Sequence, residues 1–199
     1  MDIENTWLKA EQLRATHFPP PKNTIPVDVL WLVELGLGLD IIPFDDLYAK
    51  YKVDAAIAPD HKGLYVDAES YILWEQGPMW KQNRLRFTVA HELGHLMLHE
   101  PPKFASIDSY LDYLKTPWTG KYTQEQEANE FAGRLLVPID KLRNYFDEFA
   151  LRIQQLIPDW KDSQDLRIKF ARQVAPKFAV HEDALLTRLS RERLWTTQQ

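Results

Sequence analysis

The chain has 199 residues, of which 45% are hydrophobic and 12% aromatic, enough apolar surface for one packed domain with a small addition but too little length for two full-sized domains. Its net charge of −5 argues against direct nucleic-acid binding, and no apolar stretch approaches the roughly 20 residues that span a bilayer. The absence of cysteine, and of a basic start followed by an apolar segment, predicts a cytoplasmic protein.

The N-terminal part predicts short helices and strands. Residues Ile3 to Ala15 have a helical pattern, and the prolines at 19–21 then force an extended connection. Apolar residues at helical spacing predict a second helix from about 26 to 36, which ends near two glycines. Leu39 to Pro43 predicts a short strand, and two β-prone runs between Gly63 and Trp74 predict a β-hairpin.

Two amphipathic helices are predicted in the middle of the chain. Residues 82–99 lack proline and keep one apolar face until Pro101 and Pro102 end it. Residues 103–121 contain Pro117 and Gly120 and predict an irregular connection. A further helix follows Thr123 and runs up to Pro138, with its apolar stripe at Ala128, Phe131, Ala132 and Leu135.

Beyond Pro138 the pattern is helical, with predicted breaks at Pro158 and Pro176 and no strand signal. Residues 1–138 carry 13 Lys and Arg and 20 Asp and Glu, a net charge of −7, whereas residues 139–199 carry 11 and 9, a net charge of +2. We therefore predict a domain at 1–138 followed by a small all-helical extension at 139–199.

The predicted helix at 82–99 contains the sequence His91-Glu92-Leu93-Gly94-His95. His91 and His95 are four residues apart, so their imidazoles lie on one helix face and can bind one zinc ion. Glu92 lies beside that face, where its carboxylate can act as general base and then as general acid. Gly94 has no side chain, which lets another segment come close to the metal. The motif thus predicts a zinc hydrolase.

A third ligand has to come from outside this motif. His99 cannot share the ion with His91, because eight residues of straight helix separate them by about 12 Å. The spacing predicts a surface position or a helix C-terminal position for His99, where a cation suits the helix dipole. The next helix offers Glu125 and Glu127 on the two sides of its apolar stripe, while Glu130 points largely away. Periodicity leaves the choice between Glu125 and Glu127 open.

Other polar residues are weaker candidates. Three histidines, His17, His61 and His181, lie in poorly patterned surroundings and are predicted to be surface or capping residues. Three tyrosines lie between the two site helices, Tyr110, Tyr113 and Tyr122, and a hydroxyl there could polarise a scissile carbonyl, although ordinary packing is the preferred interpretation of each.

Two sequence blocks together resemble the ImmA/IrrE family of metallopeptidases. The first runs from Arg86 to His99, and the second contains Glu127-Ala128-Asn129-Glu130-Phe131-Ala132 followed by Leu135-Leu136-Val137-Pro138. The segment from Pro26 to Pro43 is also similar to the family's N-terminal helix and strand. The resemblance implies an α+β, zincin-like fold with a small sheet or hairpin. It also implies that Glu127, directly before Ala-Asn, is the third zinc ligand beside His91 and His95.

The resemblance further implies what the protein does. Members cleave a partner transcription regulator, often a helix-turn-helix repressor, and so relieve repression. We therefore expect a zinc-dependent endopeptidase with Glu92 as the catalytic residue and a helix-turn-helix regulator as its protein substrate. The alternatives are a protein that binds and sequesters a regulator without cutting it, and a DNA-associated regulator that acts through its C-terminal helices.

The C-terminal residues 170–189 are similar to the helix-turn-helix-like segment that follows the peptidase part in many members, with the turn at Pro176 to Val180. A net charge of +2 is little for a segment that would contact several phosphates. Packing of this segment onto the catalytic domain is the preferred expectation.

Overall fold

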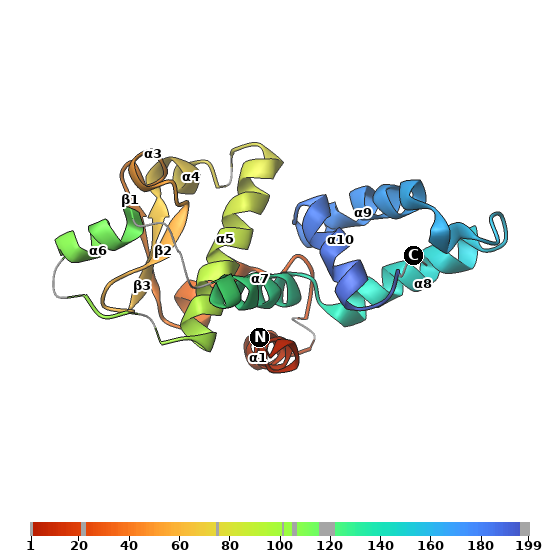
Figure 1. Ribbon diagram of the computed structural model, residues 1–199, viewed down its shortest axis with the longest axis horizontal. Coiled ribbons are helices and arrows are strands. Elements are labelled where there is room, and N and C mark those ends of the chain that lie inside the picture. The colour runs from red at the N-terminus through yellow and green to blue at the C-terminus, as the bar shows by residue number, and fades with distance from the viewer. Residues whose placement is uncertain are drawn as a thin grey trace.

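The computed structural model describes residues 2–20, 23–74, 76–100, 102–104, 107–115 and 122–195 (Figure 1). The helices in these residues are α1 (Ile3–His17), α2 (Val29–Trp31), α3 (Leu47–Tyr51), α4 (Ala68–Ile72), α5 (Met79–Leu98), α6 (Ile107–Lys115), α7 (Tyr122–Leu136), α8 (Ile139–Ile153), α9 (Gln164–Phe178) and α10 (Glu182–Arg191). The strands are β1 (Asp40–Phe44), β2 (Ala55–Ile57) and β3 (Gly63–Asp67). The predicted fold class, an α+β region with a small sheet and then helices alone, is confirmed.

The sheet has the strand order β1-β3-β2, in which β1 is parallel and β2 antiparallel to β3. The predicted strand at 39–43 is confirmed as β1, but the hairpin at 63–74 is wrong. Only its first run is a strand, because the Asp67 carboxylate accepts a hydrogen bond from the Ser70 amide at 3.2 Å and begins α4 instead. The antiparallel partner of β3 is the preceding strand β2, which lies at an edge of the sheet.

Helix α5 connects the sheet to the helical part of the molecule, since it contacts both β2 and α7. Its buried residues Leu85, Val89 and Leu93 recur every four positions, as the sequence predicted. At Gly94 the two helices come so close that an added Cβ would lie 2.9 Å from the Ala128 Cα. The absence of a side chain at Gly94 therefore permits the contact between α5 and α7.

Three other predicted segments differ from the structure. The helix expected at 26–36 is the short α2 followed by a π-helical turn, η1 (Leu32–Gly36). The connection expected to be irregular contains α6. Pro176 does not break the chain's helix, because it lies in the last turn of α9, which ends only where Ala179 adopts a left-handed conformation.

The C-terminal helices pack against the part of the chain before residue 138, as expected. Helix α1 packs against α7, and α10 contacts α7 and pairs with α9 (Figure 1). A single hydrophobic cluster contains buried residues from both sides of residue 138, among them Leu93, Phe131, Phe170 and Leu189. A short 3₁₀ turn, η2 (Trp160–Asp162), connects α8 to α9. None of the described helices has the length and apolarity needed to cross a membrane.

Candidate metal centre

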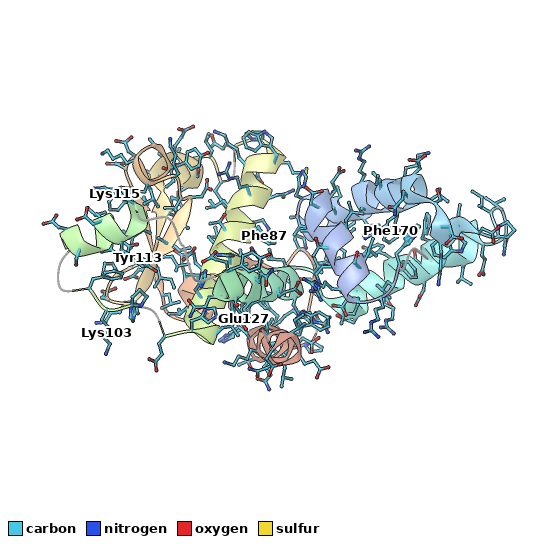
Figure 2. All side chains as sticks on the ribbon, viewed as in Figure 1. Phe87, Lys103, Tyr113, Lys115, Glu127 and Phe170 are labelled. Atoms are coloured by element: carbon cyan, nitrogen blue, oxygen red, sulfur yellow. The ribbon has the colours of Figure 1, made fainter. Side chains whose placement is uncertain are left out.

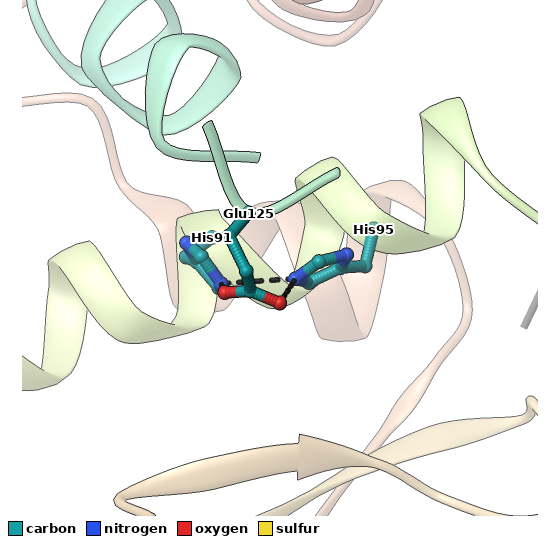
Figure 3. A group of neighbouring side chains, drawn as sticks. All are labelled: His91, His95 and Glu125. Carbon is teal, nitrogen blue, oxygen red and sulfur yellow. Dashed lines mark hydrogen bonds and ion pairs between the residues drawn. The ribbon is translucent and has the colours of Figure 1, made fainter. Parts of the chain in front are cut away.

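His91 and His95 lie one turn apart on α5 and point toward the same carboxylate (Figure 3). Their Nε2 atoms are 3.0 Å apart. The carboxylate belongs to Glu125 in the first turn of α7, with Oε2 at 3.2 Å from His91 Nε2 and Oε1 at 3.2 Å from His95 Nε2. Among the residues that the structure describes, these three form the one group with metal-ligand spacing.

The donor set fits zinc. Ligand atoms at 2.0–2.1 Å from a zinc ion in tetrahedral geometry stand about 3.3 Å apart, close to the separations in this group. Two imidazoles and one carboxylate also form the ligand pattern of catalytic zinc sites, which keep a fourth position open. Hydrogen bonds from His91 and His95 hold the pKa of the Glu125 carboxyl well below its usual range, so this donor is ionised.

The structure brings Glu125, and not the expected Glu127, to the two histidines. Glu125 and Glu127 are two positions apart, so their side chains leave the helix in directions about 200° apart around its axis. The two carboxylates therefore cannot face one ion in the same way. Glu127 Oε2 instead lies 3.0 Å from His99 Nε2, and His99 Nδ1 lies 3.2 Å from His95 Nδ1. Glu127 is thus placed behind His95, with His99 between them.

His99 is outside the metal-binding group, as its distance from His91 predicted. It caps the C-terminus of α5, which was one of the two predicted positions, but it is not a surface residue. Its side chain is 11% exposed and lies between Glu127 and His95. On the other histidine of the group, His91 Nδ1 is 3.0 Å from Asn129 Oδ1. Both His91 and His95 therefore have Nδ1 in a hydrogen bond, which fixes each ring with Nε2 toward Glu125. Spacing was the one sequence signal for Asn129 and His99, since Asn129 lies four residues after Glu125 and His99 lies four residues after His95.

A cavity of about 460 Å³ opens beside this group, between α5, the edge strand β2 and α6. Glu92 lines it, and burial raises the pKa of Glu92 to about 7, with the nearby Glu125 charge contributing. The walls are largely apolar, which accounts for that shift. A carboxyl group of this kind can take up and release a proton near neutral pH.

The tyrosine and histidine candidates divide between cavity and surface. Tyr110 and Tyr113 from α6 line the cavity, and burial raises the pKa of both hydroxyls, so both are protonated. Tyr122 is 74% exposed and outside the lining. His61 also lines the cavity, which its surroundings in the sequence did not indicate. His181 caps α10, as predicted for a capping residue.

Comparison with known proteins gives one family. The sequence pattern of the peptidase M78 family, described as the IrrE N-terminal-like domain, matches residues 80–190. The match is more than half of the chain and includes α5, α7 and the helices up to α10. A search of curated proteins found no significant match.

Proposed function

The chain belongs to the IrrE N-terminal-like family of metallopeptidases, and from this premise we propose that it is a zinc-dependent endopeptidase that cleaves a partner protein. The observation that carries the proposal is the convergence of His91, His95 and Glu125 beside the half-buried Glu92 in one cavity. These three residues would hold the zinc ion. When bound, zinc would lower the pKa of water and polarise the scissile carbonyl.

The protein's own groups supply the proton transfers and the orientation of the substrate. Glu92 accepts a proton from the attacking water and gives it to the leaving nitrogen of the substrate. Strand β2 lines the same cavity, and no strand in the described residues pairs with its outer edge, so an extended peptide segment can add there beside Ile57, whose backbone hydrogen-bonds to Glu92. The apolar walls exclude water around the reacting groups, which strengthens each electrostatic contact there.

We further propose that the substrate is a helix-turn-helix transcription repressor whose cleavage relieves repression. The resemblance of the blocks at 86–99 and 127–138 to the ImmA/IrrE family supports this substrate class. A pull-down of partners with the zinc-loaded protein, followed by mapping of the cut ends, identifies the substrate. Recovery of an intact regulator that stays bound after chelation would favour the sequestering alternative.

Replacing Glu92 by Gln removes the proton acceptor and keeps the shape of the side chain. We expect the rate of partner cleavage to fall by about 10² to 10⁴, the usual contribution of a general base. The zinc content should stay at one ion per chain, measured by atomic absorption. The matched control is Glu34→Gln, at an exposed position of η1, which should cleave like wild type. Undiminished cleavage by Glu92→Gln would refute the catalytic proposal.

A further inference from the structure

A second cavity of about 470 Å³ lies between α5, α7 and α10. Its size is close to that of the metal cavity, but its outer wall belongs to the C-terminal helices. Ala184, Thr187 and Arg188 on α10 form that wall, and His181 and Asp183 stand near its mouth. Nothing in the reaction described above uses this cavity.

The two cavities are neighbours, because Phe87 and Asn129 line both of them. Phe87 lies one turn before His91 on α5, and Asn129 lies one turn after Glu125 on α7. Figure 2 shows Phe87 on the side of α5 that faces α10. One helical turn is about 5.4 Å, a distance that two residues of extended chain can span. A peptide held at the metal cavity therefore reaches the second cavity within two or three residues.

The walls of the second cavity select an uncharged side chain. Glu130 and Arg188 are charged, but they are bonded to each other at 3.1 Å, and Glu130 also accepts hydrogen bonds from Trp7 and Arg191. The remaining inner surface is formed by Phe87, Asn129, Gly133, Ala184 and Thr187 and is mainly apolar. The exposed pair of His181 and Asp183 makes the rim polar. An apolar side chain inside and a solvated backbone at the rim match these surroundings.

We propose that the substrate-binding groove continues from the metal cavity over Phe87 and Asn129 into this second cavity, where an apolar side chain of the substrate polypeptide binds against α10. The inference rests on the proposed function, because the occupant is the segment flanking the scissile bond. It gives the C-terminal helices a part in substrate selection. The groove stays in place because α10 packs closely on α7, where a Cβ on Gly133 would lie 3.2 Å from Arg188 Cδ.

The test uses binding, so it does not depend on cleavage. Zinc-loaded Glu92→Gln protein is mixed with a library of random octapeptides, and the bound peptides are sequenced by mass spectrometry. We expect enrichment of an apolar residue at a fixed distance of two or three residues from the segment selected by the metal cavity. Adding Thr187→Trp, at an exposed position on the cavity wall, should reduce that enrichment about tenfold and leave the other positions selected as before.

The matched control is Gln173→Trp, at an exposed position of α9 outside both linings, which should select peptides like the parent. Equal enrichment with and without Thr187→Trp, or no bound peptide at all, would overturn the inference. Failure of the wild-type protein to cut its partner would instead refute the proposed function and leave the peptide selection as a separate result.

Discussion

At the scale of single residues, the main finding is that Glu125 and Glu127 lie on opposite sides of His95. Glu125 faces His95 Nε2 at 3.2 Å, whereas Glu127 Oε2 bonds to His99, whose Nδ1 in turn bonds to His95. A group that fixes the second ring nitrogen of a ligand histidine determines which nitrogen is free for the metal, and losing it costs about 10- to 100-fold in metal affinity. The structure therefore gives the two glutamates different parts in one site.

This difference predicts an order of zinc affinities. Glu125→Gln removes a ligand and should weaken zinc binding by more than about 100-fold, while Glu127→Gln removes only support and should weaken it by about 10- to 100-fold. Competition with a chromophoric chelator measures both affinities. The reverse order would make Glu127 the ligand, as the resemblance implied. His99→Ala should match Glu127→Gln, because both break the same hydrogen-bonded chain.

At the scale of elements, long amphipathic segments could be predicted and short ones could not. Helices α5 and α7 each bury a stripe over several turns, so periodicity alone locates them. Strand β2 has three residues, too few for a periodic signal, and the run at Ser70 became helical through a cap at Asp67. The motif predicted His91, His95 and Glu92. The choice of Glu125 over Glu127 depends on how α7 crosses α5, which no local pattern contains.

That crossing depends on Gly94, where an added Cβ would meet backbone atoms of Ala128 at 2.9 and 3.0 Å. Gly94→Ala should push α7 away from α5 and move Glu125 relative to the histidines. We expect at least a tenfold loss of zinc affinity, which is the range of losses when residues that hold the ligands in place are changed. This loss should occur even though alanine favours a helix over glycine by about 1 kcal/mol. The control is Gly133→Ala on α7, where the added Cβ would meet a side-chain atom of Arg188 at 3.2 Å and no backbone of α5. Equal zinc affinity in both variants would contradict this account.

At the scale of the whole molecule, buried charges attach the C-terminal helix α10 to α7 and α1. The Glu130 carboxylate accepts hydrogen bonds from Trp7 on α1, Arg188 on α10 and Arg191 on α10, although the sequence placed Glu130 on the outer side of α7. Arg188 also pairs with Glu192 and lies over the Trp7 ring. The Arg188 and Glu130 side chains are 2% and 7% exposed, so water screens this pair little.

Arg188→Ala removes a cation from this buried set and leaves carboxylates without their full complement of donors. Removing one partner of a buried ion pair costs 3–5 kcal/mol, and because Glu130 keeps Trp7 and Arg191 we expect about 3 kcal/mol. In a chain of this size that lowers the thermal midpoint by roughly 6 to 12 °C, measured by circular dichroism. Arg172→Ala breaks an exposed pair with Glu182 and should leave the midpoint unchanged.

Because one hydrophobic cluster extends across residue 138, the Arg188→Ala variant should still unfold in one transition. A second, separate transition would show that the C-terminal helices are an independent unit.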